Sequence, residues 1–284
     1  MPEHVKIFEV GPRDGLQNQK RLIATEDKIK LVDMLSNCGF SHIETTSFVS
    51  PKWVPQMADA AAVMAGISKK GGTAYTALTP NMRGYEAAIE AGVDEVAIFG
   101  SASEGFSWKN INCSIEDSLL RFLPIIEQAK IDKCKVRGYV SCVTHCPYDG
   151  RIAPDQVIRV ALRLLDMGCY EISLGDTIGA ATPETTHRLI SSVMNEIPGN
   201  LIAGHFHDTN NNALKNIDVC LEAGIRTFDS AVGGLGGCPY AEGAKGNVDT
   251  VAVVNMLHEM NYETGLSIEK LNKASAFARS LSES

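Results

Sequence analysis

The 284-residue chain lacks several features that would place it in a specialised class of protein. No apolar run approaches the roughly 18 residues of a membrane span, so we expect no membrane association. Lys and Arg number 26 against 34 Asp and Glu, a net charge of −8, and no basic run interrupts this balance. Nucleic acid is therefore not an expected partner. A strand-like run starts by Val5, which leaves no room for a signal or transit peptide.

Cysteine is present, but it does not form a recognisable framework. The eight cysteines are scattered without disulfide-framework spacing, which is typical of a reducing compartment and predicts a cytoplasmic location. Cys142-Val-Thr-His145-Cys146 resembles part of a zinc motif, but no partner pair stands elsewhere in the chain. We therefore interpret most cysteines as small buried hydrophobes.

Strand-like and helix-like patterns alternate along the chain, which is 44% apolar. Strands are expected near residues 5–10, 42–48, 73–78, 94–99, 136–142, 170–175, 201–207 and 226–232. Helices are expected at 26–37, 59–66, 82–91, 115–129, 154–167, 183–197 and 211–223. This order predicts an α/β fold, a (β/α)₈ TIM barrel formed by a single domain over about residues 4–260. A doubly wound sheet is less favoured, because no G-x-G-x-x-G follows the first strand.

A short C-terminal helix is expected at 267–280, where it would close the barrel floor or join a subunit interface. Four similar junctions support the barrel. In each, a helix ends at a glycine and a strand begins within a few residues, at Gly39, Gly92, Gly168 and Gly224. These junctions mark the strand beginnings, so Glu44 and Asp176 lie toward the carboxyl ends, where barrels of this kind carry their catalytic residues.

The first strand ends in Gly11-Pro12-Arg13-Asp14. A glycine–proline pair breaks a strand, so Arg13 and Asp14 would lie at the strand tip. There the carboxylate can hold a metal and the guanidinium can hold an oxyanion. The alternative is an ordinary surface ion pair.

The segment Gly204-His205-Phe206-His207 ends another expected strand. Side chains two apart on a strand share a face, so His205 and His207 point the same way and Phe206 points opposite. Two imidazoles with a carboxylate such as Asp14 suit a divalent ion with open positions. The alternative is a pair of histidines satisfied by hydrogen bonds at a sheet end.

A glycine-rich stretch, Gly233-Gly234-Leu235-Gly236-Gly237-Cys238-Pro239, continues to Asn247. Such a composition cannot pack a core, so it predicts a loop. Cys238 would bring a thiol to the site, and the amide oxygen of Asn247 would be a metal ligand. A phosphate cradle is the alternative, but no Gly-Lys-Ser/Thr ending supports a P-loop.

Together these residues predict one site with Asp14, His205, His207 and Asn247 as metal ligands. Mixed oxygen and imidazole donors fit Mg²⁺, Mn²⁺ or Zn²⁺. A chelated hydroxyl loses its proton more easily, which prepares a carbon–carbon bond to break. The electrons of the breaking bond then form an enolate on the neighbouring carbonyl, and this enolate needs a cationic hydrogen-bond donor such as Arg13. Retro-aldol or retro-Claisen chemistry, or its reverse, is indicated.

Four segments resemble the hydroxymethylglutaryl-CoA lyase family: residues 11–17, 173–179, 204–209 and 233–241. The resemblance implies a metal-dependent TIM barrel that cleaves 3-hydroxy-3-methylglutaryl-CoA to acetyl-CoA and acetoacetate, with Mg²⁺ or Mn²⁺ as cofactor. It implies Arg13 as enolate stabiliser, Cys238 as catalytic thiol, and Glu44, Asp176 and the ligand His205 as further catalytic residues, the first two as polar supports. The alternative for Glu44 and Asp176 is a scaffolding role, in which each only holds a neighbouring strand or Arg13. Residues near the acyl-CoA substrate would be Arg13, Gln17, Lys20, Lys109, Asn110 and Thr177. A homodimer is expected.

One departure separates the chain from this family, which usually continues Tyr-Gly-Gln where Asn210-Asn211-Asn212 stand here. It leaves open a lyase for another 3-hydroxyacyl-CoA. A condensing acyl-CoA/2-oxo acid synthase of the same superfamily is a second alternative, although such enzymes carry a longer C-terminal region. A non-catalytic acyl-CoA-binding barrel is the third, and binding alone would need neither Arg13 nor Cys238.

Overall fold

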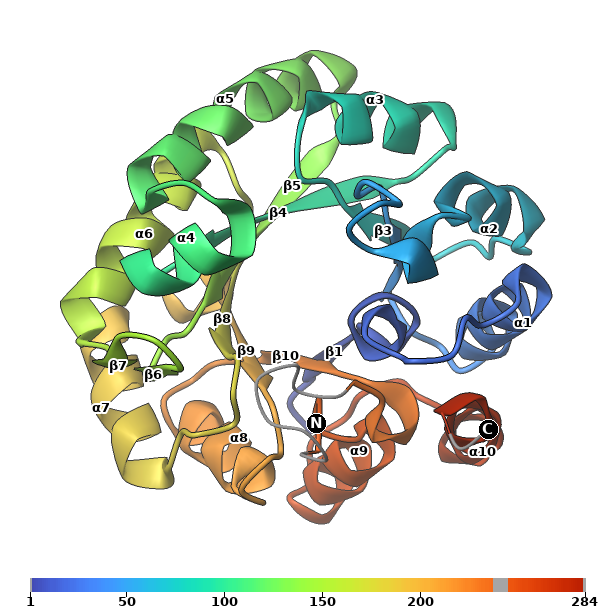
Figure 1. Ribbon diagram of the computed structural model, residues 1–284. Coiled ribbons are helices and arrows are strands. Elements are labelled where there is room, and N and C mark those ends of the chain that lie inside the picture. Colours follow the sequence, from blue (N-terminus) through green and yellow to red (C-terminus); the bar gives the residue numbers. More distant parts are fainter. Residues whose placement is uncertain (1, 237–244, 283–284) are drawn as a thin grey trace.

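The computed structural model describes residues 2–236 and 245–282 of the chain. Eight strands close into a barrel in which every neighbouring pair is parallel, in the order β1-β10-β9-β8-β5-β4-β3-β2 (Figure 1). They are β1 (Lys6–Glu9), β2 (His42–Ser47), β3 (Ala74–Leu78), β4 (Glu95–Ser101), β5 (Lys135–Ser141), β8 (Ile172–Asp176), β9 (Ile202–Phe206) and β10 (Thr227–Ser230). The predicted (β/α)₈ barrel is confirmed.

Helices surround the barrel and cover its outer face (Figure 1). They are α1 (Thr25–Ser36), α2 (Ala60–Gly66), α3 (Met82–Glu90), α4 (Glu104–Ile111), α5 (Ile115–Asp132), α6 (Pro154–Met167), α7 (Pro183–Met194), α8 (Ala213–Glu222) and α9 (Thr250–Glu259). Helix α6 ends at Gly168, which takes φ 127°, a conformation that glycine adopts without strain and that most other residues avoid.

The sequence did not predict helices α4 and α9, or a small antiparallel hairpin of β6 (His145–Cys146) and β7 (Gly150–Arg151). Phe106 and Ser107 are the buried residues of helix α4, so its sequence shows little of the apolar periodicity that marks a helix. Its start depends on Ser103, whose hydroxyl accepts a hydrogen bond from the Phe106 amide at 3.0 Å. A cap of this kind is a weak signal unless an amphipathic run follows it.

The C-terminal helix α10 (Ile268–Ser282) lies in the outer layer between α9 and α1 (Figure 1). Leu271, Ala274 and Ala278 are buried on its inner side. It therefore does not close the barrel floor, and that expectation is wrong. The alternative, a place in a subunit interface, stays a prediction.

The main apolar core lies between the barrel and the helices. Leu164 of α6 is fully buried there, and it packs over the strands at Gly100 and Gly138. A methyl group added at Gly138 would lie 3.3 Å from the Leu164 side chain and 2.8 Å from that of Ile172. Glycine at this position therefore lets the helix approach the sheet closely.

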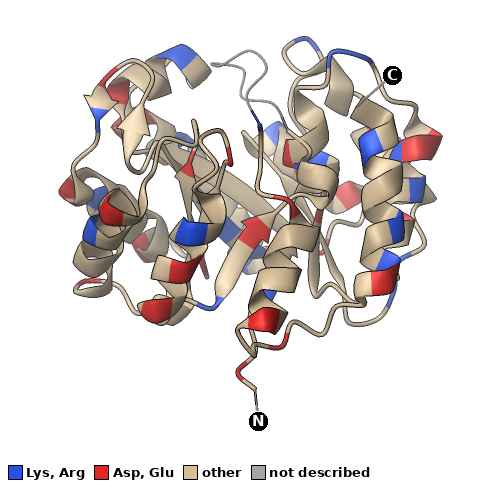
Figure 2. Cartoon of the chain, turned by 90° about the horizontal axis from the view of Figure 1, so that it is seen from below, with Lys and Arg blue, Asp and Glu red and all other residues tan. Residues whose placement is uncertain are grey.

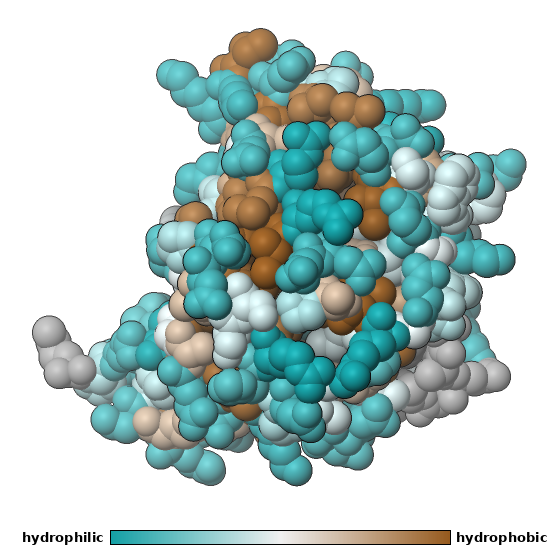
Figure 3. Space-filling model, turned by 90° about the vertical axis from the view of Figure 1, so that its left-hand side faces the viewer, coloured by the Kyte–Doolittle hydropathy of each residue, from teal (hydrophilic) through white to brown (hydrophobic). Residues whose placement is uncertain are grey.

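The outer surface is polar and carries charges of both signs. Acidic and basic residues are interspersed along the outer helices (Figure 2). On the side that carries α6 and α7, apolar atoms form patches separated by hydrophilic side chains (Figure 3). Within the part of the chain that the structure describes, no helix combines the length and the apolar character needed to cross a membrane.

Candidate active site

The chain turns sharply where β1 ends, in a π-helical turn, η1 (Gly11–Gly15), rather than the simple break that Gly11-Pro12 predicts. Proline fits the start of this turn, where its missing N–H needs no partner. The Val10 carbonyl accepts hydrogen bonds from the amides of residues 13, 14 and 15. The turn thereby fixes Arg13 and Asp14 at the carboxyl end of the barrel.

Asp14, His205 and His207 form a cluster of the kind that holds a metal ion. The Asp14 carboxylate lies 3.9 Å from Nε2 of His205 and 3.8 Å from Nε2 of His207. One ligand atom from each residue lies within 4.8 Å of the others. Burial alone would raise the pKa of Asp14, but Arg13, His207 and His205 hold it well below its usual range. An anionic oxygen and two imidazoles that face one point fit a divalent cation.

Asn247, the fourth predicted ligand, adjoins this cluster. Its backbone bridges to His207, and its side-chain Nδ2 donates to Asp14 at 2.8 Å and to the Leu235 carbonyl at 3.2 Å. Asn247 is buried, with 3% of its surface exposed. A rotation of the amide would turn its oxygen toward an ion held by the other three residues.

A buried carboxylate orients His205. The Nδ1 atom of His205 lies 3.1 Å from Asp229, which leaves Nε2 directed at Asp14. Asp229 is in turn held by two hydrogen bonds from Arg137, at 3.1 and 2.7 Å, and by one from Ser173 at 2.7 Å. Burial would raise the pKa of Asp229, but Arg137 and His205 keep it below its usual range. A carboxylate in this place fixes the ring and tautomer of a metal-binding histidine.

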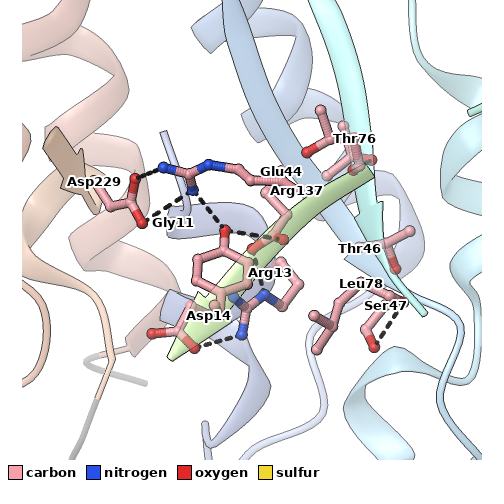
Figure 4. A network of polar contacts seen from close by, with 12 residues as sticks. Gly11, Arg13, Asp14, Glu44, Thr46, Ser47, Thr76, Leu78, Arg137 and Asp229 are labelled. Carbon is pink, nitrogen blue, oxygen red and sulfur yellow. Dashed lines mark hydrogen bonds and ion pairs between the residues drawn. The ribbon is translucent and has the colours of Figure 1, made fainter. Parts of the chain in front are cut away.

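Arg13 lies between two carboxylates. Its Nε donates to Glu44 at 2.5 Å and its Nη1 to Asp14 at 2.5 Å (Figure 4). Burial opposes the charged form, but Glu44 and Asp14 raise the pKa of Arg13 above its usual range, so it stays charged. Within the described residues these are its ion pairs, which leaves Nη2 available as a donor to a ligand.

Tyr139 connects Glu44, beside Arg13, with Arg137, beside Asp229. Its hydroxyl donates to Glu44 at 3.2 Å and accepts from Arg137 at 3.1 Å. A continuous polar network therefore runs from Asp14 through Arg13, Glu44 and Tyr139 to Arg137 and Asp229 (Figure 4). The network crosses the interior of the barrel and reaches His205.

Asp176 ends β8 and is buried, with 1% exposed. Its two oxygens accept hydrogen bonds from the amides of Ala180, at 3.1 Å, and Ala181, at 3.0 Å, in the turn that follows. Burial raises its pKa against these bonds and against nearby His207. This geometry favours a role in shaping the turn beside His207.

The remaining predicted substrate residues lie farther out. Gln17 is half-buried just beyond η1, and Thr177 is half-buried after β8, where its hydroxyl accepts from the Cys142 amide at 2.9 Å. Lys20 is exposed beyond Gln17, and Lys109 and Asn110 are exposed on α4. These residues surround the mouth of the barrel without joining the metal cluster.

Cys238 lies outside the described residues, so its predicted position is untested. The stem that precedes it is consistent with a glycine loop. Gly233, Gly234 and Gly236 take φ values of 72°, 65° and 110°, which side chains rarely allow. The seven cysteines in the described part of the chain are all free thiols, including the Cys142 and Cys146 pair.

The Asn210–Asn212 departure has a local explanation. Asn211 takes φ 57°, a left-handed conformation that asparagine tolerates better than most residues. The family usually has glycine at this position, so the backbone need not change. Asn210 donates to the Gly179 carbonyl at 3.0 Å, and Asn212 precedes α8. The departure leaves the two histidines in place.

The sequence did not point to four buried polar residues that the structure places in or beside the site: Glu9, Arg137, Tyr139 and Asp229. Each stands in a strand among apolar residues, and each is buried. The sequence carried one signal that could have revealed them. Polar residues stand two apart within a strand, as in Arg137-Gly-Tyr139, and side chains at this spacing face the same side of a barrel strand. A single charged residue within an apolar strand is easily taken for an exception. Charged residues at the interior-facing positions of several strands indicate that the barrel interior is polar.

Fold and site together indicate a TIM-barrel enzyme with a candidate divalent-metal site and a cationic donor at the mouth of the barrel. Comparisons with known proteins narrow this class. A model of the HMGL-like family matches residues 4–278. The chain belongs to this family, and the predicted hydroxymethylglutaryl-CoA lyase identity is confirmed at the family level.

Individual relatives of known name match this chain over nearly its full length. The 3-hydroxy-3-isohexenylglutaryl-CoA/hydroxy-methylglutaryl-CoA lyase of Pseudomonas aeruginosa is 56% identical over 271 residues, 95% of this chain and 90% of the relative. A crystal structure of the HMG-CoA lyase from Brucella melitensis is 56% identical with a TM-score of 0.98, covering 99% of this chain and 100% of that one. An Acinetobacter baumannii HMG-CoA lyase with coenzyme A and 3-methylmalate is 37% identical, with a TM-score of 0.93 and coverage of 98% and 91%.

Proposed function

We propose that this protein is a divalent-metal-dependent carbon–carbon lyase that cleaves 3-hydroxy-3-methylglutaryl-CoA to acetyl-CoA and acetoacetate. The observation that carries this proposal is the juxtaposition of Arg13 with the Asp14, His205 and His207 cluster. A metal-binding cluster beside a fixed guanidinium provides both requirements of a retro-Claisen step: activation of a hydroxyl and stabilisation of an enolate. A binding protein would need neither.

Asp14, His205, His207 and Asn247 would hold the ion, and the donor set favours Mg²⁺ or Mn²⁺, with Zn²⁺ also able to bind. When bound, the ion would lower the pKa of a hydroxyl group in contact with it. Asp229 keeps the His205 ring oriented toward the ion, and Asp176 shapes the turn beside His207. The residues are thus arranged before any ligand arrives.

Arg13 would meet the oxygen on which negative charge develops as the carbon–carbon bond breaks. Glu44 and Asp14 hold two of its nitrogens, so the guanidinium plane is fixed and Nη2 can donate to the forming enolate. A fixed donor needs no reorganisation at that moment, and its interaction strengthens from substrate to transition state.

The hydroxyl gives up its proton as it becomes the ketone of acetoacetate, and the enolate must gain one proton to become acetyl-CoA. We assign this transfer to Cys238, because a thiol can exchange a proton near neutral pH. Lys20, Lys109 and Asn110 are exposed at the barrel mouth and would meet the anionic and polar groups of the CoA moiety, with Gln17 and Thr177 nearer the acyl group. The relative from A. baumannii binds coenzyme A, which supports an acyl-CoA site on this fold.

A second acyl group is also a candidate. The P. aeruginosa relative carries the name of a 3-hydroxy-3-isohexenylglutaryl-CoA lyase as well, and it is 56% identical to this chain. Both esters share the hydroxyl, the carboxylate and the thioester that the site would recognise. They differ in the branch on carbon 3, so the same chemistry would serve either.

The test is an assay of chelator-stripped protein with each CoA ester, with and without Mg²⁺ or Mn²⁺. We expect both reactions to give acetyl-CoA only when metal is present. The reaction of 3-hydroxy-3-methylglutaryl-CoA should also give acetoacetate. Cys238→Ser should retain metal binding but turn over slowly, because an alcohol is a weaker acid than a thiol. Absence of product with both esters in metal-loaded protein would contradict the proposed reaction.

Two further expectations accompany this function. The free thiols in the described part of the chain support a reducing compartment such as the cytoplasm, which fractionation of the host cell would test. A homodimer is the expected assembly, and sedimentation velocity on the full chain would measure it.

A further inference from the structure

Glu9 is a buried carboxylate that the proposed reaction does not use. It is the last residue of β1, and none of its surface is exposed. Within the described part of the chain, no Lys or Arg forms an ion pair with it. A buried acid without a counter-ion is costly unless its oxygens are hydrogen-bonded, so its contacts indicate why it is there.

Three hydrogen bonds satisfy the carboxyl group. Its Oε1 accepts from the amides of Gly11 and Val232, both at 2.8 Å. Its Oε2 lies 2.8 Å from the Thr250 hydroxyl, which also contacts Ser230 at 2.8 Å. We call this arrangement the Glu9 clasp, meaning Glu9 with Gly11, Val232 and Thr250.

The clasp joins the two segments that carry Asp14 and Asn247. Gly11 begins η1, which places Asp14. Val232 and Thr250 stand at the two ends of the stretch that contains Asn247, and these ends are paired, since the Thr250 amide donates to the Ala231 carbonyl at 3.2 Å. Asp14 and Asn247 then meet at 2.8 Å.

The fit at the clasp leaves little room for movement. A methyl group added at Gly11 would lie only 2.6 Å from Oε1 of Glu9 and 3.2 Å from Val232. The carboxyl group therefore occupies the space between the two segments and sets their separation. A shorter or missing side chain would let them shift, and metal sites lose affinity when their ligands are no longer held in place.

We propose that Glu9 is a positioning residue that holds Asp14 and Asn247 at the spacing needed for one metal ion. The inference rests on the ligand set of the proposed function. It requires hydrogen bonds rather than a negative charge. Burial raises the pKa of Glu9 to about 8, against the Val232, Thr250 and Gly11 donors and aided by nearby Asp249. A neutral amide can therefore replace the acid, accepting the two N–H bonds through Oε1 and donating to Thr250 through Nε2.

The experiment measures Mn²⁺ affinity of the chelator-stripped full-length protein by calorimetry, without substrate. Glu9→Ala should weaken binding by about 10-fold to 100-fold, the range typical of outer-shell partners, whereas Glu9→Gln should bind close to the wild type. Glu95→Ala is the matched control. It also removes a buried, hydrogen-bonded carboxylate, but at the start of β4, beside Lys135 and Tyr170 at the opposite end of the barrel.

A double-mutant cycle with Asn247→Ala separates this inference from the proposed function. If Glu9 acts through Asn247, the loss of Mn²⁺ binding free energy in the double variant should be smaller than the sum of the losses in the two single variants. Unchanged affinity in Asn247→Ala alone would refute the ligand set. A loss in Asn247→Ala together with full affinity in Glu9→Ala, or with fully additive losses, would refute the clasp. Should Glu9→Ala fail to fold, Thr250→Val removes one of the three bonds and should give an intermediate loss, and full affinity there would overturn the proposal.

Discussion

Arg137 and Leu164 are both buried beside the barrel strands, yet their surroundings have opposite character. Arg137 lies inside the barrel, where Asp229, Glu171 and Tyr139 contact its guanidinium. Leu164 lies outside it, where α6 packs on the strands against apolar side chains. The interior of many TIM barrels is filled by branched aliphatic residues, so the charged interior of this protein is a specific feature.

The difference indicates a division of roles between the two regions. Apolar burial in the outer shell is non-directional and provides most of the stability. The buried charges inside cost desolvation that their pairing largely offsets, so they add little net stability but hold geometry closely. We infer that the shell keeps the barrel closed while the interior network positions Arg13 and His205.

The largest effect should come from the interior at the metal cluster. His205→Ala should abolish turnover while the protein stays folded, because an exchangeable divalent ion with an open site depends on every ligand. Chelator treatment of the wild type should do the same and be reversed by Mn²⁺. Activity assays with circular dichroism on the same samples check both, and full activity in metal-stripped His205→Ala would remove the site assignment.

Arg13→Lys should come next. An ammonium cannot keep the planar pair of contacts to Glu44 and Asp14 while also donating to an enolate. Loss of one transition-state donor typically costs about 10²–10³ in kcat, and KM should change little. Arg188→Lys is the control, since Arg188 pairs with Glu184 on the outer surface of α7. A large rise in KM with unchanged kcat would contradict the assigned role.

Asp229→Asn should have a smaller effect, limited mainly to metal affinity. The amide keeps the shape but weakens the hold on Nδ1 of His205, and such outer partners are worth about 10-fold to 100-fold in metal affinity. Glu171→Gln is the matched control, because it also removes a carboxylate from Arg137, and its other ion-pair partner among the described residues is Lys6 rather than a histidine. Equal losses of Mn²⁺ affinity in both variants would show that only the charge on Arg137 matters.

The same contrast explains what the sequence could predict. The shell follows periodic patterns, so all eight barrel strands and every described α-helix except α4 and α9 were placed within a few residues. Asp14, His205 and His207 were found because loop breaks and the His-x-His spacing expose them locally. Arg137 and Asp229 were not found, since they are 92 residues apart and meet only after the barrel closes. Helix α4 was also missed, since it buries Phe106 and Ser107 alone and its sequence shows little apolar periodicity.

The smallest effect on catalysis should come from the shell. Leu164→Ala removes a fully buried side chain that packs over Gly100 and Gly138, so the cavity should lower the free energy of unfolding by about 2–5 kcal/mol. The kcat per folded molecule and the Mn²⁺ affinity should stay close to wild type, because α6 contributes no side chain to the network around Arg137. Urea unfolding gives the stability, and calorimetry gives the affinity. A shell variant that weakened metal binding as much as Asp229→Asn would mean that the two regions are mechanically coupled, and the division of roles proposed here would fail.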